Sequence, residues 1–105
     1  KIHREEGIAL CCGVLGLFIY NNEGDLKEAE RYLRRSTRMN DHLGRFGAVA
    51  AAYGNIGLVR AKRKDFRTAR QMLLKALGIY QRLNRPKMVQ KVQQMLTQLS
   101  KATPA

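Results

Sequence analysis

Apolar residues recur at steps of three and four along most of the chain, which is the spacing of a one-sided helix. The clearest case lies between Asp65 and Leu83, where Phe66, Ala69 and Leu73 begin one apolar stripe. No alternation typical of a strand runs longer than a few residues. The pattern predicts five helices, at about residues 3–22, 25–41, 44–62, 65–84 and 86–101.

Three of these helices have a suitable residue at their predicted start. Asp25 and Asp65 carry short acceptors that can bond the free N–H groups of a first turn. Pro86 lacks an N–H, which costs nothing in the first turn of a helix. We therefore expect the second and fourth helices to be capped by aspartate and the fifth to begin at proline.

The chain also repeats itself with a period of about 40 residues. Residues 24–33 align with 64–73 at a shift of 40, and residues 12–17 align with 53–58 at a shift of 41. Each period holds two predicted helices, so the repeated unit is a helical hairpin. A hairpin cannot bury its apolar face alone, and neighbouring hairpins must therefore stack. Gly16 and Gly57 occupy matching positions, where a missing side chain lets paired helices approach closely.

The second period resembles the tetratricopeptide repeat. The resemblance rests on these residues: Ala50, Tyr53, Asn55, Ile56, Gly57, Asp65, Phe66, Ala69, Leu73 and Ala76. The 40-residue period is similar to the long-helix variety in kinesin light chains and Pins-type adaptors. The first period departs from the motif, with Cys12 for the aromatic residue and Val14 for the asparagine. The resemblance implies an all-α fold, a right-handed superhelical stack of antiparallel helical hairpins.

We expect a single domain over residues 1–105, with repeat 1 at about 3–41, repeat 2 at about 44–84 and a capping helix at about 86–101. Two repeats are fewer than the roughly three needed for independent stability, so we expect a fragment of a longer chain. Residues 8–19 are apolar nearly all round, yet only one side of their helix has a partner in this sequence. We therefore expect self-association, or docking of further helices, through residues 8–19.

The charge of the chain is unevenly distributed. The net charge is +12, and residues 42–105 hold thirteen basic side chains against one acid, Asp65. The densest basic patch comprises Arg60, Lys62, Arg63, Lys64, Arg67 and Arg70. Such a field attracts acidic peptides, nucleic acid or anionic lipid. The tyrosines that could stack on bases, Tyr20, Tyr32, Tyr53 and Tyr80, sit at predicted core or groove positions and not among these cations. The sequence therefore disfavours nucleic acid without excluding it.

No residue constellation points to catalysis, a metal site or a cofactor, so we expect a protein that is not an enzyme. The adjacent Cys11 and Cys12 are interpreted as reduced core thiols, which favours a cytoplasmic location. The longest uncharged stretch, residues 7–22, falls short of the ~20 apolar residues that a transmembrane helix needs.

The resemblance also implies a peptide-binding groove, lined by the first helix of each hairpin. The matching residues are Leu17, Tyr20, Asn21, Ala51, Gly54, Asn55, Leu58, Lys62, Lys91 and Gln94. The amide of Asn55 can read a peptide backbone because it carries a donor and an acceptor, or it can bond a neighbouring helix. The sequence thus predicts a non-catalytic module that binds a peptide or helix, with an acidic partner favoured by the charge. The alternatives are a basic surface for nucleic acid or anionic surfaces, and a purely structural oligomerisation module.

Overall fold

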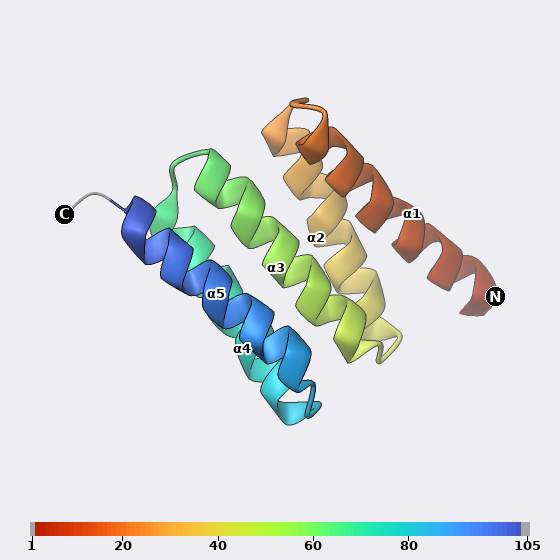
Figure 1. Cartoon of the computed structure of the whole chain (residues 1–105). Coiled ribbons are helices and arrows are strands. Elements are labelled where there is room, and N and C mark those ends of the chain that lie inside the picture. Colours follow the sequence, from red (N-terminus) through yellow and green to blue (C-terminus); the bar gives the residue numbers. More distant parts are fainter. Residues whose placement is uncertain (1, 104–105) are drawn as a thin grey trace.

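The computed structural model describes residues 2–103, and residues 1 and 104–105 of the expected domain lie outside the described residues. Within residues 2–103, five helices follow one another in antiparallel order (Figure 1). They are α1 (Ile2–Asn21), α2 (Leu26–His42), α3 (Phe46–Lys62), α4 (Phe66–Arg82) and α5 (Pro86–Ala102). The structure confirms the predicted all-α stack of helical hairpins, with helix bounds within two residues of those expected.

The same tight turn joins every pair of helices. Each turn holds one residue with a positive, left-handed φ. In chain order these residues are Glu23, Gly44, Lys64 and Asn84. The N–H group after each of them donates back to the carbonyl five residues earlier, as from Asp65 to Arg60 at 2.9 Å and from Arg85 to Tyr80 at 3.0 Å. This is the Schellman way of closing a helix. Because the turn recurs every 20 or 21 residues, it sets the period seen in the sequence.

The predicted caps are present. The Asp25 carboxylate accepts a hydrogen bond from the Lys27 N–H at 2.9 Å, and that of Asp65 accepts one from the Thr68 N–H at 3.2 Å. Pro86 stands at the start of α5.

The stack is a thin slab of 49 × 34 × 17 Å. α1 and α2 pack as one hairpin, and α3 and α4 pack as a second. The two hairpins are joined by the contact of α2 with α3, and α5 packs on α4. In Figure 1, α5 lies in front of α4, on the same side of the slab as α3. None of the helices within residues 2–103 has the length and apolarity that crossing a bilayer demands.

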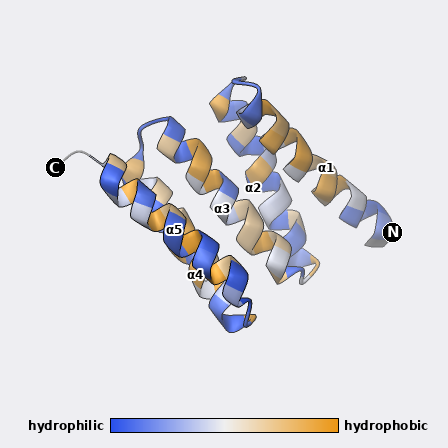
Figure 2. Cartoon of the chain, in the orientation of Figure 1, coloured by the Kyte–Doolittle hydropathy of each residue, from blue (hydrophilic) through white to orange (hydrophobic). Residues whose placement is uncertain are grey.

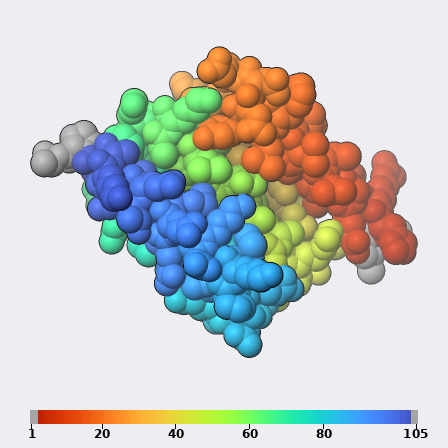
Figure 3. Space-filling view, viewed as in Figure 1, coloured from red at the N-terminus to blue at the C-terminus, as the bar shows by residue number. Residues whose placement is uncertain are grey.

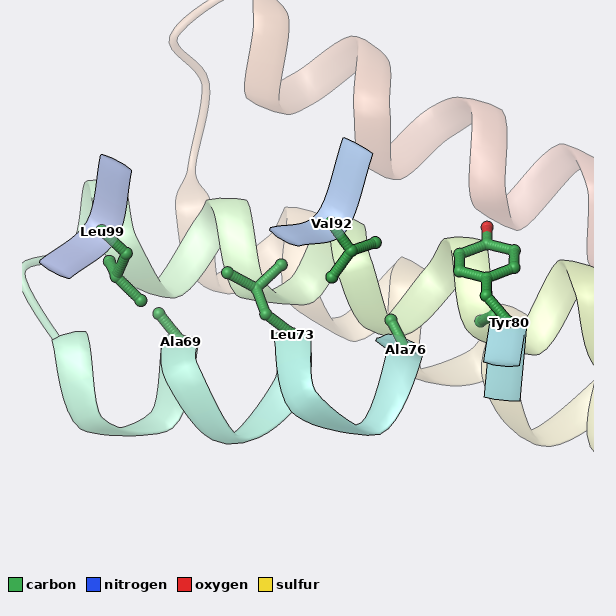
Figure 4. Close-up of a cluster of buried hydrophobic side chains, with 7 residues drawn as sticks. Ala69, Leu73, Ala76, Tyr80, Val92 and Leu99 are labelled. Carbon is green, nitrogen blue, oxygen red and sulfur yellow. The ribbon is translucent and has the colours of Figure 1, made fainter. Parts of the chain in front are cut away.

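Two apolar clusters hold the stack together. One joins α3, α4 and α5, and Figure 4 shows Leu73 and Tyr80 on the side of α4 that faces Val92 and Leu99 of α5. The other joins α2 to α3 and α4 and consists of Ala29, Leu33, Ile56, Val59 and Met72. The first cluster therefore ties the second hairpin to α5, and the second cluster ties it to α2 of the first hairpin.

The prediction that both cysteines are core thiols is wrong for one of them. Cys12 is buried, whereas Cys11 is exposed. The reason is that α1 is packed only on the side of α2 and α3, and Cys11 points to the side that no described residue covers. Leu10, Leu15 and Phe18 are exposed on the same helix.

Candidate functional site

A hollow of about 200 Å³ lies between α1 and α3, with α2 as its floor. We call it the α1–α3 hollow. Its walls include Leu17 of α1 with Ala51 and Asn55 of α3, all three of which the sequence placed in the groove. The rest of its lining is mostly apolar: Ala9, Leu10, Gly13, Val14, Leu33, Ser36, Asn40, Arg45, Ala48 and Ala52. The structure thus brings these three predicted residues of α1 and α3 together around one hollow.

A second hollow, of about 130 Å³, lies between α3 and α5 and shares Ala51 and Asn55 with the first. We call it the α3–α5 hollow, and it also holds the predicted Gly54, Leu58 and Lys91. Each of these two hollows is smaller than the ~300 Å³ of a typical small-molecule pocket. They suit single side chains better than a cofactor.

A third, more open hollow of about 430 Å³ lies at the end of the helices where α3 turns into α4. We call it the turn hollow. Leu58 lines it together with Tyr20, Lys62, Lys64 and residues of α5. The three hollows are therefore linked by one stripe of α3, Ala51, Asn55 and Leu58, whose spacing of four and three puts them on one helix face. Figure 3 shows this side of the molecule, with α3 between α1 and α5.

The charges that line the three hollows have one sign. Among the described residues, Arg45, Lys91, Lys62 and Lys64 line the hollows and no Asp or Glu does, although the Arg45 guanidinium lies 3.9 Å from the Glu6 carboxylate of α1. Within residues 2–103 the amide of Asn55 makes no side-chain hydrogen bond, so the predicted alternative of a bond to a neighbouring helix is not realised. The predicted Asn21 and Gln94 are exposed and lie outside these three hollows.

Polar residues of α2 that the sequence pattern did not single out form the floor of the α1–α3 hollow. The Ser36 hydroxyl donates to the Ala9 carbonyl of α1 at 3.0 Å, and the Asn40 Nδ2 donates to the Ser36 carbonyl at 2.9 Å. The Asn40 Oδ1 is buried without a hydrogen-bond partner among the described residues. Both side chains are buried although they are polar, so hydropathy gave no signal of them.

The predicted basic patch is not one free surface. Arg60 donates to Glu30 of α2 through two nitrogens, at 2.7 and 2.8 Å, and to Asp65 at 2.8 Å. Arg63 and Arg34 also contact Glu30, at 3.4 and 2.8 Å. Glu30 is only 6% exposed. Arg60 and Arg63 therefore pair with Glu30 and join α2 to α3. The six basic residues do not form one continuous free patch, which corrects that expectation.

The remaining members of the patch separate into two places. The Lys62 ammonium lies 4.7 Å from the centre of the Tyr20 ring and donates to the Tyr20 carbonyl at 3.4 Å, at the turn hollow. Lys64 lines the same hollow. Arg67 and Arg70 are exposed on α4 and line none of the three hollows. Of the predicted patch, Lys62 and Lys64 thus line the turn hollow, whereas Arg67 and Arg70 lie on α4 away from the three hollows.

The Glu30 cluster has an electrostatic consequence. Burial by itself raises the pKa of Glu30, but the hydrogen bonds from Arg60 and Arg34, with the charges of both, outweigh it and hold the pKa below its ordinary value. Hydrogen bonds from Thr68 and Arg60 likewise lower the pKa of Asp65. Glu30 is therefore a carboxylate at neutral pH despite its burial.

The described residues offer no group of three His, Cys, Asp or Glu side chains that could hold a metal ion. The groove presents apolar surface, cations and amides that are free among the described residues, such as that of Asn55. These groups can bind and orient a chain segment through shape, hydrogen bonds and charge.

The comparison with protein families agrees with this geometry. A family model of the tetratricopeptide repeat matches residues 15–83, which is more than half of the chain. No curated protein matches the sequence significantly. Members of this family generally mediate protein–protein interactions and are generally non-catalytic. That the repeats are of the kinesin light chain-like variety stays a prediction, because the family match does not confirm the variety. The chain belongs to the tetratricopeptide repeat family.

Proposed function

We propose that the chain binds a peptide segment of a partner protein in the groove formed by α1, α3 and α5. The observation that carries the proposal is the α3 stripe, because Ala51 and Asn55 line two hollows and Leu58 joins the second to the third. A peptide lying along α3 meets side-chain-sized hollows in succession, with a free amide between them.

The length and chemistry of the peptide follow from the same residues. The 17 residues of α3 span about 25 Å, at roughly 1.5 Å per residue. An extended peptide covers that length with about seven or eight residues, at ~3.3 Å each. The apolar walls favour apolar side chains, and lining cations without lining acids favour Asp and Glu beside them.

Two classes of groove residue have different tasks. The Asn55 amide bonds the peptide backbone at short range, which makes its contribution insensitive to salt. Lys62 and Lys91 act through charge, and their contribution falls as the Debye length shortens from ~10 Å at 0.1 M to ~3 Å at 1 M salt.

The test is a selection from a library of displayed eight-residue peptides, followed by titration of one selected peptide at 50 and 500 mM salt. We expect Asn55→Ala to weaken binding about fivefold at both salt concentrations, since a lost hydrogen bond is worth roughly 1 kcal/mol. Lys91→Glu should weaken binding at 50 mM and much less at 500 mM. The matched control is Arg70→Glu, the same charge reversal outside the groove, which should have little effect.

An oligonucleotide is titrated in parallel, because a nucleic-acid surface is the competing function. Tight binding of a generic single strand with a steep logarithmic salt slope, abolished by Arg70→Glu and unchanged by Asn55→Ala, contradicts the proposal. A library that yields no peptide dependent on Asn55 or Lys91 contradicts it as well.

A further inference from the structure

One face of α1 carries apolar side chains that the described residues leave exposed or, at Ile8, only half-buried. We call Ile8, Cys11, Leu15 and Phe18 the outer face of α1. Leu15 is 42% and Phe18 is 62% exposed, and Cys11 is exposed beside them. Figure 2 shows α1 as largely hydrophobic along its middle. Contiguous apolar surface of this kind marks an interaction site on a folded protein.

The internal repeat shows what kind of contact this face makes. At the shift of 41, the four residues of the outer face match Val49, Ala52, Ile56 and Val59 of α3. All four of these are buried, at 4% exposure or less, in the region where α2 packs on α3. The same positions thus receive a helix in the second repeat. The outer face of α1 therefore has the pattern of a surface on which a helix packs, although no described helix packs on it.

The opposite end of the stack cannot provide that helix from another copy of the chain. The α3 residues that contact α4 match four polar or charged residues of α5 at a shift of 40: Gln90, Gln93, Thr97 and Lys101. All four are exposed. Because this end is polar, head-to-tail stacking of copies would bury unpaired polar groups against apolar ones.

The outer face of α1 is complementary to itself. Its large–small–large order Ile8, Cys11, Leu15 has the spacing of Leu26, Ala29 and Leu33, the α2 residues that contribute to covering α3. No charged residue occurs from residue 7 to residue 22, so two such faces can meet without like charges opposing. In an antiparallel pairing centred near Gly13, the basic Arg4 of one copy comes level with the acidic Glu23 of the other.

Away from α1, large exposed apolar side chains on the described surface occur only singly. Phe46 begins α3 and Leu74 lies on α4, whereas Leu15 and Phe18 lie together on the outer face of α1; Leu10 and Val14, also exposed on α1, line the α1–α3 hollow. We propose that a second copy of the chain covers the outer face of α1, with the two outer faces packed antiparallel about a two-fold axis. Such an isologous interface closes on itself and does not propagate. This inference does not rest on the proposed function, since it uses a different face of α1.

The test is the mass of the chain in solution, measured by sedimentation equilibrium from 5 to 500 μM. We expect a mass of twice 11.9 kDa at the upper concentrations, and no loss of the dimer at 1 M NaCl, because the contact is apolar. Leu15→Glu combined with Phe18→Glu should give the 11.9 kDa monomer with unchanged helical circular dichroism. Leu74→Glu, at an exposed leucine on α4, is the control and should remain dimeric.

Phe18→Ala is a milder variant, which keeps the test decisive if the double variant unfolds. It should raise the dimer dissociation constant at least tenfold. A folded wild-type chain that stays monomeric up to 500 μM overturns the proposal, and the outer face then awaits a helix from outside this sequence. A dimer that survives both sets of substitutions overturns it too, because the contact then lies elsewhere.

Discussion

At the scale of single residues, two glycines decide how closely the helices of each hairpin approach. A Cβ on Gly16 would lie 2.7 Å from the Leu33 Cγ and 3.0 Å from the Ala29 carbonyl oxygen. A Cβ on Gly57 would lie 3.0 Å from the Leu73 Cγ and 3.3 Å from the Ala69 carbonyl oxygen. The contacts match in the two repeats, and the first is tighter. Even one methyl group at Gly16 requires the Leu33 side chain or the α2 backbone at Ala29 to shift.

We expect Gly16→Ala to destabilise the fold by about 1–3 kcal/mol through overpacking, and Gly57→Ala to destabilise it less. The control is Gly78→Ala on α4, where a Cβ meets nothing within 4 Å. Removing glycine from an open helix position should instead stabilise by roughly 0.5–1 kcal/mol. Thermal melting measures all three, with ~4–8 °C expected per kcal/mol. Equal melting temperatures for Gly16→Ala and Gly78→Ala would show that the close approach at Gly16 is not needed.

These glycines could be found from the sequence because each repeats at a matching position beside a recognisable motif. Ser36 and Asn40 could not. A polar residue on a helix is ordinarily expected on the solvent side, and only the packing of α1 over α2 buries these two. The same limit applies to Cys11, whose exposure depends on which side of α1 has a neighbour.

At the scale of helices, the Glu30 cluster is a buried polar joint between hairpins that also meet through apolar contacts. Glu30 belongs to α2, whereas Arg60 and Arg63 belong to the end of α3 and the turn after it. Sequence reasoning assigned these arginines to a free patch because charge runs are counted along the chain. Glu30, which pairs with both arginines, lies 30 residues before Arg60 in the sequence. The two residues come together only because the helices stack.

Because of this cluster, we expect the free energy of unfolding to depend on pH. The pKa of Glu30 is lower in the folded chain than in the unfolded one, so its contribution is complete above the unfolded value, roughly 4.3, and is lost as the pH falls through the folded value. Glu30→Gln should cost about 2 kcal/mol at pH 7, in the range for hydrogen bonds to charged groups. The difference from wild type should shrink as the pH falls below about 4.

Urea unfolding at pH 7, 5, 4 and 3 measures this difference. Glu28→Gln serves as the control, because Glu28 is exposed on the same helix and makes none of the ion pairs of the cluster. A gap between Glu30→Gln and wild type that stays constant from pH 7 to pH 3 would contradict the role given to the Glu30 carboxylate.

At the scale of the whole molecule, the stack has two unlike ends and one lined groove. The α5 end is polar, the α1 end is apolar, and the hollows lie between α1, α3 and α5. The repeat in the sequence predicted the stack, and all but two of the groove residues assigned from it line one of the three hollows. It could not predict that Asn21 and Gln94 lie outside the hollows, because their helix faces depend on the rotation of α1 and α5 against α3.

The central claim is that a peptide occupies the groove. Its most direct test is a series of two-dimensional ¹H–¹⁵N spectra of the labelled chain, recorded while a peptide from the selection is added to saturation. We predict that the amide signals of Leu17, Ala51, Asn55, Leu58 and Lys91 move most, while those of Arg67, Arg70 and Leu74 on α4 stay in place. Signals that move along α4 and leave Ala51 and Asn55 unchanged at saturation would contradict the account.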